Sequence, residues 1–201
     1  MSDGPLLSTV NGAAGGRRGT AGLRHRIAER RQLARLDRAA AQLAELHLVR
    51  TVLGGAAGVV AAGWIQDGWF AYRDDQGRQQ VVTAHDLHRI AGRQPTAACL
   101  VGAIVQAGGG LPAAHSQPVH RALNLAWQAL FGSTEPVEYC PAPGLRVARV
   151  RELTAWNDRP NRTASEVHAV LVAAGRRAAD QPKSNELTCA GSSATTVLVR
   201  R

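Results

Sequence analysis

The sequence has few aromatic residues, few cysteines and almost no lysine. Aromatic residues make up 4% of the 201 residues, whereas alanine supplies 36 and glycine 21. A core built from such small side chains is thin, because each of them buries little apolar surface. With 45% hydrophobic and 19% charged residues, the chain can still form one ordinary domain with tails. Its length excludes a large multidomain enzyme.

The three cysteines, Cys99, Cys140 and Cys189, are widely spaced and include no CxxC pair. An odd number at such spacing indicates neither a disulfide framework nor a zinc ribbon, and it favours reduced thiols inside a cell. The N-terminus lacks a basic segment followed by a long apolar one, so no secretory signal is expected. The uncharged stretch 51–66 is shorter than the roughly 20 residues of a membrane span. We therefore predict a cytoplasmic protein without a membrane span.

Common catalytic and phosphate-binding motifs are missing as well. The sequence contains no GxxxxGK[ST], GxGxxG, GxSxG or HExxH pattern. His85 and His88 stand three residues apart, a spacing that could hold one metal ion, and His115 with His120 could complete such a site. Because no carboxylate cluster accompanies these histidines, we predict no metal site and no cofactor.

The formal net charge is +9 and the pI is near 11. A positive field concentrates polyanions, so this charge favours nucleic acid or an acidic protein as a partner. Lys183 is the single lysine among 24 basic residues. Such a bias toward arginine, together with abundant alanine and glycine, is typical of a very GC-rich genome. Part of the positive charge therefore reflects residue usage rather than function.

The basic residues gather near the N-terminus, in a segment with helical periodicity. Residues 1–22 lack apolar periodicity and are predicted to be a disordered tail. Residues 23–48 are predicted to form a basic helical arm, which carries one narrow apolar stripe at alternating steps of three and four. The stripe consists of Leu33, Leu36, Ala40, Leu43 and His47. The candidate binding residues of the arm are Arg24, Arg26, Arg30, Arg31, Arg35 and Arg38.

Residues 49–179 are predicted to form a helical domain, followed by a disordered tail over 180–201. The pattern predicts helices over 49–66, 96–107 and 117–131, a loop over 133–144, and a short helix or turn over 147–155. It also predicts a short helix that Thr83 or Asp86 caps and that ends near Gly92. Residues 69–72 and 79–82 predict a β-hairpin. A last helix begins at Thr163, which forms a capping box with Glu166. The predicted fold class is mainly α: a small helical bundle with one β-hairpin, preceded by a basic helical arm.

Three short patterns of this domain resemble a family of uncharacterised actinobacterial and phage proteins that is classified as a domain of unknown function. The patterns are Gly68-Trp69, the segment Cys99-Leu100-Val101-Gly102-Ala103, and Trp156-Asn157-Asp158 followed by Arg162-Thr163 and Glu166-Val167. The resemblance covers roughly residues 49–179. It implies a compact, mostly helical domain and brings no activity. It does not extend to the basic arm.

The third pattern has two interpretations. In the structural one, Trp156 anchors the loop, Asn157 and Asp158 form Asx turns, and Thr163 caps the last helix. In the functional one, Asn157, Asp158 and Arg162 surround a helix N-terminus whose free amides bind an anion.

Cys99 is the one candidate nucleophile, with His85 or His88 as its base. The start of a helix lowers the pKa of a thiol, which favours this interpretation. Cysteine is also among the most buried residue types, and Cys99 shares an apolar stripe with Ala103 and Ile104. A structural role therefore competes with catalysis.

These features favour a non-enzymatic accessory or binding module whose basic helix contacts nucleic acid or an acidic protein. One alternative is a small cysteine-dependent hydrolase or transferase centred on Cys99. A further alternative is a homodimer with a structural role, built through residues 30–50, in which the arginines only keep the assembly soluble.

Overall fold

The computed structural model describes residues 16–132 and 142–191, with side chains described for 23–132 and 142–180. The chain divides into two units, an arm (Met1–Gln42) and a body (Leu43–Arg201). The predicted boundary at residue 48 thus falls a few residues inside the body. Residues 1–15 of the predicted N-terminal tail, 133–141 of the predicted loop and 192–201 of the predicted C-terminal tail lie outside the described residues.

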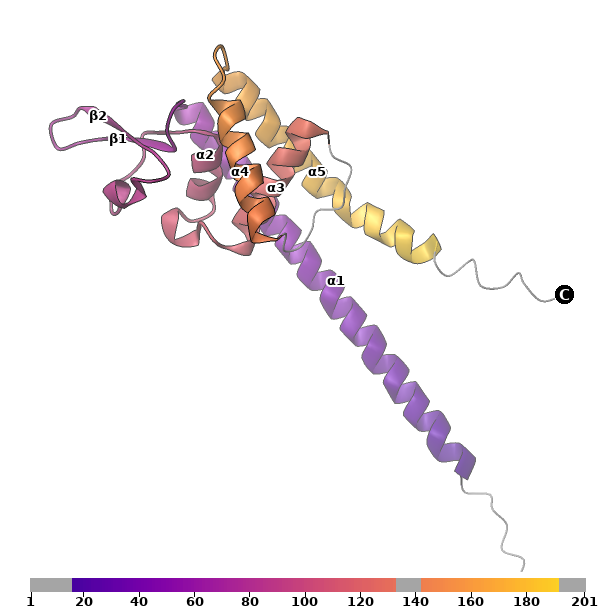
Figure 1. The fold of residues 1–201 in the computed structure, drawn as a ribbon. Coiled ribbons are helices and arrows are strands. Elements are labelled where there is room, and N and C mark those ends of the chain that lie inside the picture. Colours follow the sequence, from indigo (N-terminus) through magenta and orange to yellow (C-terminus); the bar gives the residue numbers. More distant parts are fainter. Residues whose placement is uncertain (1–15, 133–141, 192–201) are drawn as a thin grey trace, which may run out of the picture. The chain divides into compact units, whose positions relative to one another are not determined.

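The first helix, α1 (Gly16–Ala62), is continuous where the sequence predicted a disordered segment up to residue 22 and then two helices (Figure 1). This correction has a simple cause, because residues 16–62 contain no proline. The glycines of α1 each cost about 1 kcal/mol relative to alanine, and packing offsets that cost. A Cβ atom on Gly55 would lie 3.1 Å from the Cβ of Ala107, so the two backbones approach closely there.

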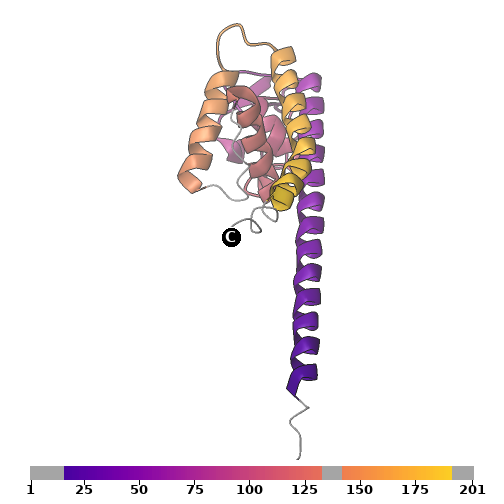
Figure 2. The same ribbon diagram turned by 90° about the vertical axis from the view of Figure 1, so that its right-hand side faces the viewer.

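The body is built around apolar residues that recur every three or four positions along α1. Val49, Leu53, Ala56 and Val60 are all buried. They pack into one core with residues of α2 (Leu100–Ala107), α3 (Gln117–Phe131), α4 (Pro143–Asn157) and α5 (Ala164–Gly191). Helix α3 contacts both α4 and α5 and lies between them (Figure 2). The fold is mainly helical, as predicted.

The predicted hairpin is present, and a third strand joins it. β1 (Phe70–Arg73) pairs antiparallel with β2 (Gln79–Val82), and on its other side with β3 (Ala97–Ala98). The carboxylate of Asp74 orders the turn by accepting the backbone N–H groups of Gln76 and Arg78. Phe70 and Tyr72 are buried against the helices, which a two-stranded hairpin needs for stability.

The third strand corrects the prediction that a helix begins at Thr96. The N–H of Thr96 donates to the carbonyl of Ala71, so the chain is extended here. Helix α2 begins only after Cys99, which is its N-cap. A short 3-10 helix, η1 (Leu87–Ile90), precedes the strand, and another, η2 (Leu111–Ala113), follows α2.

The last two helices are longer than predicted. α4 starts at Pro143, because the missing N–H of proline is harmless at the first position of a helix. The capping box of α5 is confirmed: the N–H of Thr163 donates to the Glu166 carboxylate at 2.9 Å, and the N–H of Glu166 donates to the Thr163 hydroxyl at 3.3 Å. α5 then continues to Gly191 and replaces the predicted tail from 180 to that point.

Alanine substitutions at two glycines test the packing of this core of small residues. A Cβ on Gly102 would lie 2.0 Å from the carbonyl oxygen of Trp69, so Gly102→Ala is expected to lower the free energy of unfolding by about 1–3 kcal/mol. Gly54 lies within α1, and a Cβ atom on it would have no atom within 4 Å. Gly54→Ala should therefore raise the free energy of unfolding by about 0.5–1 kcal/mol. Urea denaturation measures both. Equal effects of the two substitutions would contradict the close contact at Gly102.

Candidate functional site

The arm presents arginines on one side of α1. Arg24, Arg31, Arg35 and Arg38 follow one another at steps of seven, four and three residues, and all four are exposed. At 3.6 residues per turn they fall within an arc of about 60°, over a helix length of about 21 Å. We call this row the arginine face. Arg26 and Arg30, also exposed, lie about 150° and 110° around the helix from the centre of this face, so they are not part of it.

The predicted apolar stripe of the arm lies across the helix from the arginine face. Leu33 and Leu36 are 60% and 59% exposed, and Leu43, the next leucine of the stripe, is 54% exposed. The stripe is centred about 150° around α1 from the arginines. The arm is therefore an amphipathic helix with a cationic side and an uncovered leucine side.

The arginine face has no acidic partner among the described residues. The ion pair found within the arm joins His25 to Glu29, which lies away from this face. Arg38 donates from Nε to the carbonyl of Ala34 on its own helix at 2.8 Å. The guanidinium groups therefore extend into solvent, where an anion can reach them.

Within the body, the carboxamide of Asn157 joins three separate parts of the chain. Its Oδ1 accepts the indole N–H of Trp64 at 2.9 Å and the backbone N–H of Leu100 at 3.1 Å. Its Nδ2 donates to the carbonyl of Ile65 at 3.1 Å and to the carboxylate of Asp158 at 2.8 Å. We call this arrangement the Asn157 junction. Asn157 is fully buried, so it takes part in long-range contacts rather than in the predicted Asx turn.

Neighbouring side chains extend the junction. Gln66 Nε2 donates to the carbonyls of Asn157 and Arg159 at 3.0 and 2.8 Å. The N–H of Asp67 donates to the Asp158 carboxylate at 3.1 Å. This bond holds Asp67 at a φ of 58°, a left-handed conformation that non-glycine residues seldom adopt. The segment after α1 is thereby fixed to the end of α4.

Arg162 and the N-terminus of α5 are engaged by other groups of the chain. The Arg162 guanidinium lies 3.9 Å from the centre of the half-buried Trp156 ring, and it forms a 2.8 Å ion pair with Glu166. Hydrogen bonds from Thr163 are the main reason that the pKa of Glu166 is lowered. The Glu166 carboxylate thus occupies the place that the functional interpretation of this loop gave to an external anion.

Cys99 has a structural position. Its Sγ accepts the N–H of Gly102 at 3.4 Å and caps α2, and the side chain is fully buried. Burial raises the pKa of the Cys99 thiol to about 12, so the thiolate is scarce at neutral pH. His85 and His88, the predicted bases, are exposed residues next to and within η1. The geometry does not support a nucleophile at Cys99.

His115 and His120, which the sequence offers as possible metal ligands, lie near each other in the described part of the chain. Their ring centres are 6.1 Å apart. Across residues 16–132 and 142–191, no group of three or more His, Cys, Asp or Glu side chains is placed to hold a metal ion.

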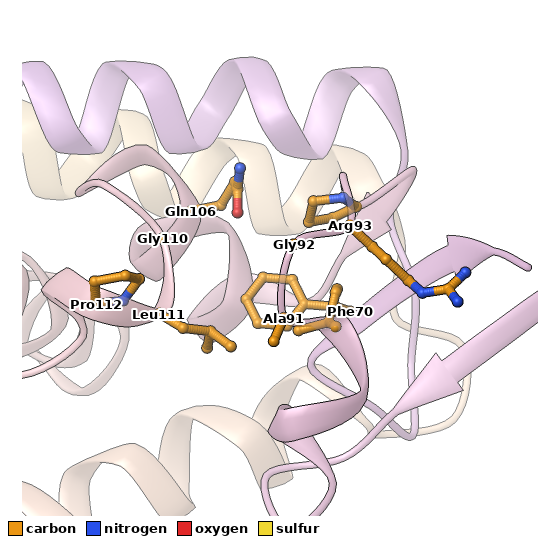
Figure 3. A pocket seen from close by; sticks show the side chains of 10 residues that line it. Phe70, Ala91, Gly92, Arg93, Gln106, Gly110, Leu111 and Pro112 are labelled. Atoms are coloured by element: carbon orange, nitrogen blue, oxygen red, sulfur yellow. The ribbon is translucent and has the colours of Figure 1, made fainter.

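A cavity of about 570 Å³ opens between β1, η1 and the end of α2 (Figure 3). Its lining is mostly apolar, with the amide of Gln106 on one wall. Arg93 is at its edge, and its guanidinium points away from the cavity, paired with Asp75 at 3.2 Å and stacked on Tyr72. The described lining contains no histidine, cysteine or acidic side chain, so it lacks the groups of common acid-base and nucleophilic mechanisms.

One stretch of α1, within residues 23–62, is long and apolar enough to cross a membrane by length and composition alone. The core helix of a soluble protein passes the same test. Val49, Leu53 and Val60 of this stretch are buried in the body, so part of its apolar surface is already covered.

Comparison with known families is informative for the body. The model of a family of unknown function, DUF6197, matches residues 44–177. The chain belongs to this family. Neither the curated proteins nor the solved structures include a match. The DUF6197 region coincides closely with the body and leaves the arginine face outside it.

Sequence reasoning missed the Asn157 junction and the buried ion pair between Arg121 and Glu45, whose charged atoms lie 2.8 Å apart. Asn157 and Trp64 are 93 positions apart, and no local pattern connects them. For Arg121, the sequence does contain a pattern that could have indicated a buried polar position. Polar residues recur at three- or four-residue steps along α3, at Gln117, Arg121, Asn124 and Gln128.

Asn157→Ala is expected to lower the free energy of unfolding by about 2–4 kcal/mol, because it leaves the N–H groups of Trp64 and Leu100 buried without a partner. Trp64→Phe removes only one of these donors. The double variant should be less destabilised than the sum of the single ones, which denaturation of all four proteins measures. Strict additivity would contradict the shared hydrogen bond.

Cys99 should resist thiol reagents in the folded protein. In a chain with Cys140→Ser and Cys189→Ser, labelling of Cys99 by a disulfide reagent at neutral pH is expected only when the body unfolds, because the thiol is buried and protonated. The labelling rate should therefore follow the unfolding equilibrium as urea is added. Rapid labelling without urea would overturn this structural assignment.

Proposed function

We propose that the protein is a non-enzymatic binding module that attaches to the phosphate backbone of nucleic acid through the arginine face. The observation that carries this proposal is the row of four exposed arginines on one side of α1, without an acidic partner among the described residues. Guanidinium groups form bidentate hydrogen bonds with phosphate and release counterions from the polymer. Contacts of this kind bind the backbone and do not depend on base sequence.

The division of the chain supports the same proposal. The body is a DUF6197 domain whose candidate nucleophile is buried and whose cavity lining, as described, holds no acid-base pair. The arm adds exposed cations to it. The leucine side of the arm remains available for a second chain, and pairing there would leave the arginine face open to nucleic acid.

Two double variants of the full chain test the arginine face. Arg31→Gln with Arg35→Gln removes two charges from the face, and Arg26→Gln with Arg30→Gln removes two charges from positions more than about 100° away around the helix. Fluorescence anisotropy with a 20-base-pair DNA duplex at several salt concentrations measures binding. The first variant should reduce the slope of log affinity against log salt by about two, and the second by less than one.

Several results would contradict the proposal. The first is a wild-type chain that does not bind duplex DNA at low salt. The second is an equal loss of affinity in the two variants, because the charge alone would then act and not its position on the helix. Tighter binding to poly-L-glutamate than to DNA would assign the arm to an acidic protein instead.

A further inference from the structure

Helix α3 carries a row of buried polar side chains, Arg121, Asn124 and Gln128. Asn124, in this row, is 3% exposed, and its Oδ1 accepts a hydrogen bond from Arg149 Nη1 on α4. Its Nδ2 is buried and has no hydrogen-bond partner in the described part of the chain. The bond from Arg149 fixes which end of the amide is the oxygen. A buried N–H donor without an acceptor destabilises the fold, so an acceptor from outside the chain would be favoured here.

The pairing of α3 with α4 brings basic side chains to the same place. Asn124 contacts Arg149, and Trp127 contacts Glu152, both at a separation of 25 positions. This constant offset shows that the two helices run in the same direction, so their first turns meet. His120 and Arg146 lie at that end, and both are half-buried.

A small cavity opens where these side chains meet. His120, Asn124, Arg146 and Arg149 line it together with Leu123 and Val150, and its volume is about 10 Å³. That is room for roughly one water molecule or one oxygen atom of a larger group. Because His120 and Arg146 are half-exposed, the rest of such a group can remain in solvent.

Among the described residues, the charged side chains that line the cavity all have one sign. The described lining includes two arginines and a histidine but no acidic residue. Burial lowers the pKa of His120, and the nearby positive charges of Arg146 and His115 lower it further. A bound anion would relieve this repulsion and favour the protonated imidazole.

We propose that this cavity is a binding site for a phosphate group. One phosphate oxygen accepts from Asn124 Nδ2, and His120 and Arg146 flank the remaining oxygens. The site lies entirely within the body and does not depend on the arginine face. Its occupation and the attachment of the arm can therefore be tested separately.

NMR titration of the histidines in the full chain tests the site. Sulfate is the probe, because it is a tetrahedral dianion that keeps its charge where histidine titrates. Replacing chloride by sulfate at constant ionic strength should raise the pKa of His120 by about one. His168, which is exposed on α5, serves as the internal reference. A response of His120 no larger than that of His168 would overturn the proposal.

Variants separate binding from structure. Arg146→Gln should raise the pKa of His120 in chloride and weaken sulfate binding about tenfold or more. Arg151→Gln, which removes the same charge from an exposed position of α4, should do neither. Asn124→Asp places a carboxylate in the cavity and should raise the pKa of His120 while abolishing its response to sulfate. Identical behaviour of the Arg146 and Arg151 variants would exclude the site.

The same readout distinguishes two sources of the phosphate group. A response of His120 to inorganic phosphate alone assigns the site to a free phosphate or a phosphate monoester. An additional response to duplex DNA in the Arg31→Gln, Arg35→Gln variant assigns it to the phosphodiester backbone. Either response supports the site, and the absence of both overturns it.

Discussion

The carboxamide of Asn157 is the constraint on which the body most depends. It is the last residue of α4, and it binds the segment that follows α1 and the first N–H of α2. An amide suits this position because it offers an acceptor and a donor from one rigid group. A buried polar group that satisfies several others also fixes their mutual orientation, which apolar contacts alone do not do. The core of small side chains can then close around this fixed point.

Close approach of backbones replaces bulky side chains in this core. Gly102 lies directly against the Trp69 carbonyl, and Gly55 lies against Ala107. Such contacts gain dispersion energy over many atom pairs although each residue is small. They also tolerate little change, because a methyl group added at Gly102 would meet the Trp69 backbone and one added at Gly55 would meet the Cβ of Ala107. The low aromatic content of the sequence thus results in tight helix packing rather than in a loose interior.

The sequence was informative wherever local chemistry decides structure. The hairpin, the helix over 117–131 and the capping box at Thr163 all follow from periodicity or from residues a few positions apart. Tertiary contacts decided the rest. The third strand consists of two alanines that acquire their conformation from β1, and Asn157 acquires its role from residues about ninety positions away. No pattern in a single sequence encodes such pairings.

The candidate sites also include features that the sequence predicts and features that only tertiary structure shows. The basic residues of the arm are evident from composition, and helical periodicity places four of them on one side of the helix, but only the structure shows that this side is exposed and has no acidic partner among the described residues. Cys99 and the histidines matched a catalytic pattern by residue type alone, and burial of the thiol removes that interpretation. The polar row of α3 was visible as a period in the sequence. Its meaning depended on which helix faced it.

The continuity of α1 has a thermodynamic consequence. An isolated helix must form its first turn at a loss, because several residues are ordered for a single hydrogen bond. In this chain that first turn is already supplied by the buried residues near Val49 and Leu53, and the arm only has to propagate it. The helical conformation of the arm therefore depends on the folded body. Melting the body would uncoil the arm as well, and the spatial order of its cations would be lost.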